Sequence, residues 1–113
     1  MRRLPILAGL LSAAALCAGG AGAATPAAAP DGHALFRVRC GMCHGASGMG
    51  TNLLARRTKP AELAKRTDLQ ADFVVQAART GIGNMPPITR GDVSDTELSA
   101  IAHWLATPPD QRK

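Results

Sequence analysis

One six-residue stretch, CGMCHG from Cys40 to Gly45, constrains this chain more than any other feature of its sequence. Two cysteines lie three positions apart, and His44 follows the second one directly. Three chemistries use such a group of side chains: a disulfide, a zinc site, and the covalent attachment of a haem. Each needs different surroundings, so the rest of the chain decides among them.

The first 24 residues have the pattern of a secretory signal peptide. A pair of arginines precedes an uncharged run from Leu4 to Ala18, and the segment closes on the small residues Ala21-Gly22-Ala23. An uncleaved membrane anchor is the alternative, but the apolar run is short for a membrane span. We therefore expect residues 1–24 to be removed, and Cys17 with them. The mature protein would then lie in the periplasm without stable membrane insertion.

The mature chain reads as one small domain. Residues 25–31 form a linker rich in Pro and Ala, residues 32–107 form the domain, and residues 108–113 form a short tail. No stretch alternates like a strand, whereas apolar residues recur at helical spacing. We therefore expect an all-α fold of three to four short helices.

The first half of the domain is expected to hold one helix, a loop and a helical turn. The helix begins after Asp31, which suits an N-cap, and runs through the cysteine motif to Gly45. The glycine-rich segment 45–59 is expected to be a loop. A short helical turn then begins with Pro60 at its first position.

A third helix is expected between a start at Thr67 and a stop at Gly81. Thr67 and Gln70 have the spacing of a capping box, and glycine is the usual residue at a helix C-terminus. Four apolar residues at helical spacing would form its inner face: Phe73, Val74, Ala77 and Ala78.

The last helix has the clearest boundaries. Ser94 and Glu97 have the spacing of a capping box, and Pro108-Pro109 prevents continuation. Its apolar residues follow the pattern i, i+3, i+4, i+7: Leu98, Ile101, Ala102 and Leu105.

Such a domain has few large side chains with which to fill its centre. Phe36, Phe73 and Trp104 are its only large aromatic residues, and domains of this size are marginally stable. A large apolar cofactor would complete the core.

The sequence favours haem among the three chemistries. A disulfide between Cys40 and Cys43 would close a very small loop and stabilise little. A closed zinc site needs four ligands, and outside the motif the mature chain offers only His33 and His103. A thioredoxin-like redox pair would need a βαβ unit. We therefore expect one haem c, held by thioethers to Cys40 and Cys43, with His44 as the proximal iron ligand.

A second axial ligand is expected from a constrained segment downstream. Met85 lies in GIGNMPP, between a glycine-rich turn and two prolines that exclude a helix there. The other candidates fit less well: Met42 lies inside the attachment loop and Met49 follows His44 too closely. His33 precedes the first helix, and His103 suits the surface of the last one. We therefore predict axial ligation by His44 and Met85.

With these residues, the chain resembles class I c-type cytochromes, the monohaem electron carriers of the bacterial periplasm and of mitochondria. The resemblance covers about Gly32 to Leu105 and includes the attachment motif, Met85-Pro86, and the spacing of Gly32 and Phe36 before Cys40. It implies the class I cytochrome c fold around one covalently bound haem. In that fold the glycine matching Gly32 lets the first and last helices cross near a right angle, with Ile101, Trp104 and Leu105 at the crossing.

One departure from that family lies after the motif. The family commonly has Gly-Pro-x-Leu there, and the proline carbonyl accepts a hydrogen bond from the outer nitrogen of the proximal histidine. This chain has Gly50-Thr51-Asn52-Leu53, in which the threonine carbonyl can accept the same bond from a less restricted loop. A narrower resemblance, over residues 78–106, is to the small cytochrome subunits of periplasmic flavoprotein dehydrogenases such as p-cresol methylhydroxylase.

These features together predict an electron carrier and not an enzyme. It would accept one electron from a dehydrogenase donor and pass it to an oxidase or another cytochrome. One alternative is a fixed cytochrome subunit of a flavoprotein or quinoprotein dehydrogenase. Another is a small peroxidase or gas-binding haem protein, if Met85 leaves the iron easily.

The uneven charge is most simply explained by a solvated basic face, and a dedicated docking patch is the alternative. Two of the thirteen basic residues lie in the signal peptide, so the mature chain keeps a positive net charge against eight acidic residues. Nucleic acid is not an expected partner, because the exported chain has no motif for it. Five basic residues would steer an acidic redox partner if they line the haem edge: Arg56, Arg57, Lys59, Lys65 and Arg66.

Overall fold

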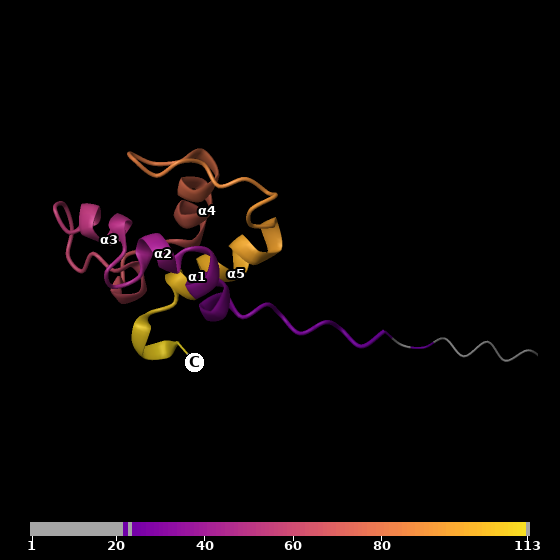
Figure 1. The fold of residues 1–113 in the computed structure, drawn as a ribbon. Helices are drawn as coiled ribbons and strands as arrows, with labels where there is room; N and C mark the ends of the chain where they lie inside the picture. The colour runs from indigo at the N-terminus through magenta and orange to yellow at the C-terminus, as the bar shows by residue number, and fades with distance from the viewer. Residues whose placement is uncertain (1–21, 23, 113) are drawn as a thin grey trace, which may run out of the picture.

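The computed structural model describes residue 22 and residues 24–112, and within them the fold is all-α, as predicted (Figure 1). The predicted signal peptide, with Cys17, lies almost entirely outside the described residues. The elements, in chain order, are α1 (Gly32–Arg39), α2 (Gly41–His44), α3 (Met49–Leu54), η1 (Leu63–Lys65), α4 (Ala71–Thr80), α5 (Asp95–Ala106) and η2 (Pro109–Gln111). Across the described residues, none of the helices has the length and apolar character needed to cross a membrane.

The first predicted helix is divided in two at Cys40. Asp31 is its N-cap, as predicted, and the carboxylate accepts hydrogen bonds from the backbone N–H groups of His33 and Ala34 at 2.9 and 3.2 Å. At Cys40 the backbone leaves the helical region, with φ −120° and ψ −22°, and α2 begins at the next residue. The predicted end at Gly45 is confirmed, because Gly45 is the C-cap of α2.

The last helix agrees with the prediction at both ends. Glu97 N–H donates to Ser94 Oγ at 3.2 Å, and Ser94 N–H donates to the Glu97 carboxylate at 2.8 Å, which completes the capping box. The helix ends at Ala106, two residues before Pro108. All four predicted core residues of this helix are buried: Leu98, Ile101, Ala102 and Leu105.

Helices α1 and α5 cross with their backbones in close contact. A Cβ atom at Gly32 would lie 2.2 Å from the carbonyl oxygen of Ala100 and 2.7 Å from Cβ of Trp104. The Trp104 ring lies against Phe36 of α1, with ring centroids 5.2 Å apart. The crossing that the cytochrome resemblance implied is therefore present, and only glycine fits at position 32.

Three predictions for the middle of the chain were wrong. The segment expected to be a loop contains α3, whose Leu53 and Leu54 are partly buried. The turn expected to start at Pro60 is the 3₁₀ helix η1, which starts three residues later. The capping box of Thr67 with Gln70 does not form, because Gln70 itself is the N-cap of α4 and its side chain makes no capping bond.

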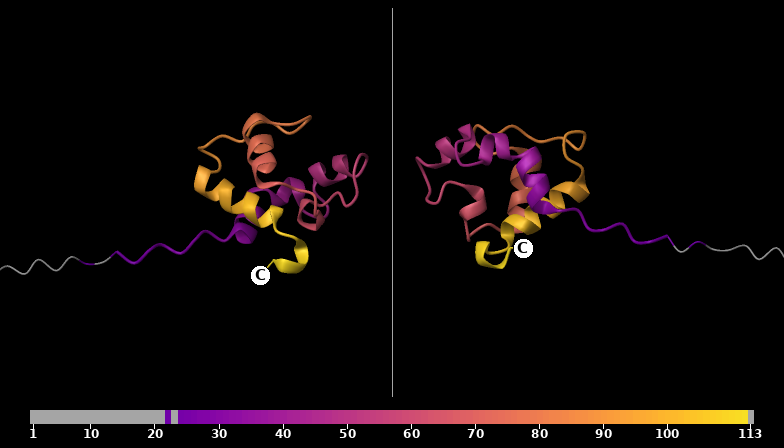
Figure 2. Two further views of the ribbon diagram at one scale, coloured as in Figure 1. Left: turned by 180° about the vertical axis from the view of Figure 1, so that it is seen from behind. Right: turned by 60° about the horizontal axis from the view of Figure 1, so that its bottom comes forward.

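The core lies where α1, α4 and α5 meet, while α2 and α3 extend to one side (Figures 1 and 2). Its buried residues are Phe36, Leu69, Ala78, Val93, Leu98, Ile101 and Leu105. Arg79 connects α4 to the segment before α5, because its guanidinium donates to the carbonyls of Ile88 and Val93 at 3.0 and 2.9 Å. It also pairs with Asp95, the first residue of α5, at 2.9 Å. Phe73, predicted on the inner face of α4, is instead 50% exposed.

Arg112, near the C-terminus, packs back onto the domain. Its guanidinium lies over the Trp104 ring, 4.5 Å from the centroid, and donates to the carbonyls of Leu105 and Thr107 at 2.8 and 2.7 Å. It also donates to the carbonyl of Ala64 in η1. The C-terminal end of α5 is thereby joined to the segment between α3 and α4.

Candidate functional site

The three residues of the attachment motif lie within a single helical turn. Cys43 and His44 both donate their backbone N–H groups to the carbonyl of Cys40, at 3.1 and 2.9 Å. This turn holds the three residues close together, with Cys40 as the N-cap of α2 and Cys43 and His44 within the helix. No disulfide joins Cys40 and Cys43 in the structure; Cys40 is partly buried and Cys43 is exposed.

Burial also sets the protonation state of this group. Burial raises the pKa of the Cys40 thiol, and the nearby Cys43 raises it further, so Cys40 is a neutral thiol near neutral pH. Burial lowers the pKa of His44, so its imidazole is neutral and one ring nitrogen has a free lone pair. A neutral imidazole of this kind is what an iron ion binds.

Two glycines bring α3 directly against the motif. A Cβ atom at Gly48 would lie 2.3 Å from the carbonyl oxygen of Cys43. At Gly50 it would lie 2.8 Å from that same oxygen and 3.0 Å from Cε1 of His44. From the sequence these glycines were expected in a loop, and their contact with the motif was not predicted. The available signal was their position just after the motif.

These surroundings fit a large, flat, apolar group. His44 Nδ1 is buried and has no hydrogen-bond partner. Large apolar side chains on several elements remain exposed: Val38, Met42, Met49, Phe73 and Ile82. No cluster of three or more His, Cys, Asp or Glu side chains in the described residues is arranged to hold a metal ion.

Met85 lies in a tight turn closed by two backbone hydrogen bonds. Ile82 N–H donates to the carbonyl of Met85 and Met85 N–H donates to that of Ile82, both at 3.0 Å. Gly83 has a φ of 56°, as the first central residue of a type II′ turn requires. The turn leaves α4 toward the side of the molecule where α2 and α3 lie (Figures 1 and 2).

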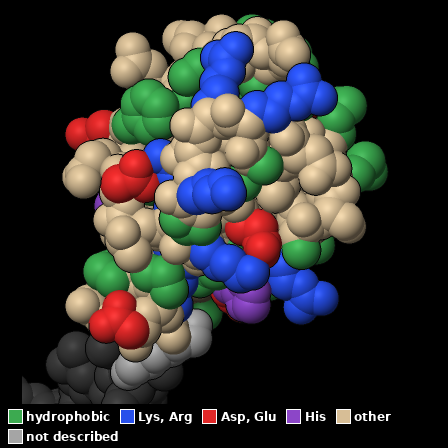
Figure 3. All heavy atoms as spheres, turned by 90° about the vertical axis from the view of Figure 1, so that its left-hand side faces the viewer, with side chains coloured by type: hydrophobic (Ala, Val, Ile, Leu, Met, Phe, Trp, Pro, Cys, Tyr) green, Lys and Arg blue, Asp and Glu red, His purple; other side chains and the backbone are tan. Residues whose placement is uncertain are grey.

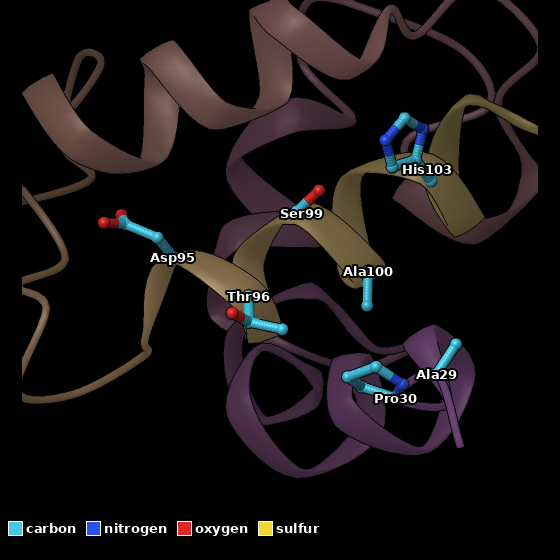
Figure 4. Close-up of a pocket in the computed structure, with 7 residues that line it drawn as sticks. All are labelled: Ala29, Pro30, Asp95, Thr96, Ser99, Ala100 and His103. Atoms are coloured by element: carbon cyan, nitrogen blue, oxygen red, sulfur yellow. The ribbon is translucent and has the colours of Figure 1, made fainter. Parts of the chain in front are cut away.

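Burial separates Met85 from the other candidate ligands. Met85 is partly buried and packs against the core, whereas Met42 is 90% and Met49 69% exposed. His33 stacks on Trp104 with ring centroids 4.9 Å apart. His103 lines a surface hollow between α5 and the linker residues Ala29 and Pro30, on another part of the molecule (Figure 4).

An all-α domain with the Cys-x-x-Cys-His motif on a short helix beside a glycine-supported second helix defines a c-type cytochrome. Residues 27–105 match the family model for cytochrome C oxidase, cbb3-type, subunit III. The chain belongs to this family, and it is therefore a haem-binding electron-transfer protein, with haem c as its covalently bound cofactor and redox proteins as its partners. Domains of this kind typically work outside the cytoplasm.

The other comparisons add no relative. No curated protein and no solved structure matches the chain. The narrower resemblance to the cytochrome subunits of flavoprotein dehydrogenases such as p-cresol methylhydroxylase is not supported by the family match.

Proposed function

We propose that this chain is a periplasmic monohaem cytochrome c that carries single electrons between proteins. One haem c would be attached through Cys40 and Cys43, with His44 and Met85 as axial ligands. The observation that carries the axial assignment is the partial burial of Met85 in a turn closed by two hydrogen bonds, while its methionine competitors are exposed. The signal-peptide pattern in residues 1–24 supports the periplasmic location.

Each residue of the site has a separate task in this proposal. When bound, the haem iron supplies the one-electron redox chemistry. The two cysteine sulfurs would hold the group at α2, and the neutral imidazole of His44 would bind its iron. The thioether of Met85 favours ferrous iron and so raises the reduction potential. The prolines after Met85 and the turn before it limit the movement of this ligand.

The surroundings of Met85 favour a carrier over a peroxidase. Its neighbours Asn84, Pro86 and Pro87 have no side chain that exchanges protons near neutral pH. General acid–base catalysis on a bound peroxide would need such a group. Two firmly held axial ligands would also leave the iron without a position for substrate.

The absorption spectrum of the ferrous holoprotein tests this proposal. We expect a spectrum of covalent c-type haem that carbon monoxide leaves unchanged, because both axial positions are held. Rapid binding of carbon monoxide would instead show a missing or labile sixth ligand and favour the gas-binding or peroxidase alternative. Absence of covalent haem from protein matured in the periplasm would contradict the whole assignment.

Ion pairs in the structure reduce the number of basic residues expected to steer a redox partner. Lys65 pairs with Glu62 at 2.6 Å, and Arg66 pairs with Asp68 at 2.5 Å. Three exposed basic residues after α3 have no carboxylate partner among the described residues: Arg56, Arg57 and Lys59. We call these three the α3 basic group. Figure 3 faces the side of the molecule that carries α3, over which many Lys and Arg side chains are spread.

We expect the α3 basic group to speed electron exchange with anionic partners. The triple variant with glutamine at Arg56, Arg57 and Lys59 should oxidise more slowly with hexacyanoferrate(III) at low salt, by roughly tenfold, the lower limit for electrostatic steering. The difference should shrink as ionic strength rises, because salt screens exposed charges. Stopped-flow absorption of the ferrous holoprotein measures both effects.

The control variant removes the same charge from residues that are ion-paired. It carries glutamine at Arg39, Lys65 and Arg90, which pair with Glu97, Glu62 and Asp95. Equal slowing of both triple variants would mean that net charge, and not the α3 basic group, controls the rate.

A further inference from the structure

Only three buried side-chain nitrogen or oxygen atoms in the described residues lack a hydrogen-bond partner: His44 Nδ1, Thr51 Oγ1 and Arg79 Nε. The Arg79 guanidinium is well bonded through its other nitrogens. The remaining two atoms both belong to the junction of α2 and α3. Since an unpaired buried polar group is costly, their occurrence at one junction needs an explanation.

The backbone before Thr51 passes directly beside the His44 ring. A Cβ atom at Gly50 would lie only 3.2 Å from His44 Nδ1. Thr51 is the next residue, and it is 5% exposed, the only polar or charged side chain classed as buried in the described residues. Its hydroxyl is therefore held out of water close to the part of the chain that touches the imidazole.

The two unpaired atoms are chemically complementary. A histidine that binds iron through Nε2 carries its hydrogen on Nδ1, which makes Nδ1 a donor, and a threonine hydroxyl oxygen accepts. The backbone carbonyl of Thr51 already accepts a hydrogen bond from Ala55 N–H at 2.9 Å. Threonine in a helix populates two χ1 rotamers, so the direction of the Thr51 hydroxyl can change by rotation about its Cα–Cβ bond.

We propose that Thr51 is a positioning residue whose hydroxyl oxygen accepts the hydrogen bond from Nδ1–H of His44 when the haem is bound. The inference rests on the proposed function, in which His44 binds the iron. Cytochromes with proline at this position have no side-chain oxygen there, so the role is specific to a chain with threonine. An acceptor on Nδ1 makes the imidazole more basic, which favours ferric iron.

Substitution of Thr51 in the holoprotein tests this role. Thr51→Val removes the hydroxyl and keeps the side-chain shape and the backbone carbonyl, while Thr51→Ser keeps the hydroxyl. At a fixed solution potential we expect Thr51→Val to raise the ratio of ferrous to ferric protein about threefold, which corresponds to about 28 mV for a one-electron couple. Thr51→Ser should stay close to the wild-type ratio.

Nuclear magnetic resonance of the ferrous holoprotein supplies a second readout. The His44 Nδ1–H proton should resonate upfield in Thr51→Val and exchange faster with solvent, because it has lost its acceptor. An unchanged Nδ1–H proton would overturn the proposal whether or not the redox ratio moved, because the acceptor would then be another group, such as the backbone carbonyl. If Thr51→Val does not take up haem, the pair Thr51→Ser and Thr51→Ala isolates the hydroxyl in the same way.

A different set of resonance shifts would show that the proposed function itself is wrong. A histidine bound to the iron lies over the porphyrin, so its ring protons show large ring-current shifts in the ferrous protein. If the His44 protons lack those shifts in every variant and in the wild type, His44 is not the ligand. If the shifts are present and only the response to Thr51→Val is missing, the proposed function stands and the role of Thr51 is wrong.

Discussion

Replacing Met85 with alanine is expected to produce a haem protein that binds carbon monoxide and has a much lower reduction potential than the wild type. The alanine methyl cannot reach or bind the iron, so one axial position becomes open to small ligands. The potential falls because a thioether ligand favours ferrous iron. Axial ligands move haem potentials over a range of about 0.8 V, and we expect a fall of about a quarter of that range. Spectroscopic redox titration and carbon monoxide titration measure the two effects.

The chain contains matched controls for this experiment. Met42 and Met49 are also methionines near the motif, and they are 90% and 69% exposed. Alanine at either position should leave both the potential and the carbon monoxide response unchanged. If Met49→Ala opens the iron and Met85→Ala does not, the assignment of the sixth ligand has to move to Met49.

Replacing Gly32 with alanine should strongly destabilise the folded holoprotein. Helix propensity alone predicts little change, because Gly32 is the first residue of α1 and the preference for alanine over glycine applies to a helix interior. The new Cβ, however, would meet the carbonyl oxygen of Ala100 at 2.2 Å, and both helices would have to separate. We expect a net loss of about 3 kcal/mol in the free energy of unfolding, at the upper end of the usual range for overpacking.

Thermal unfolding measures this loss, because each kcal/mol lowers the midpoint of a domain this small by roughly 4–8 °C. Gly91→Ala is the matched control, since its nearest neighbour would be Thr89 Oγ1 at an ordinary 3.5 Å. A Gly32→Ala protein that melts at or above the wild-type temperature would show that the α1–α5 crossing tolerates a side chain, contrary to the structure.

Helix α5 could be predicted from the sequence and helix α3 could not, for a physical reason. The signals for α5 are local: Ser94 and Glu97 satisfy each other's backbone N–H groups, and Pro108 cannot continue a helix. The helix α3 has no such signals, because it starts with Met49 and Gly50 after Gly48, and glycine disfavours helix formation. Its two glycines are needed for contact with α2, and that contact becomes visible only when both elements are placed.

The candidate site also has some features that the sequence reveals and others that only the tertiary structure reveals. The Cys-x-x-Cys-His motif can be read from the sequence alone, because Cys40, Cys43 and His44 are neighbours in the chain, and their role in holding the haem stays a prediction. The all-α class followed from the apolar spacing of the helices. Two other features depended on tertiary packing. One is which methionine is shielded from solvent, and the other is that Thr51 and His44 each have a buried side-chain atom without a hydrogen-bond partner. Burial is a property of elements far apart in sequence, so only the tertiary structure could decide it.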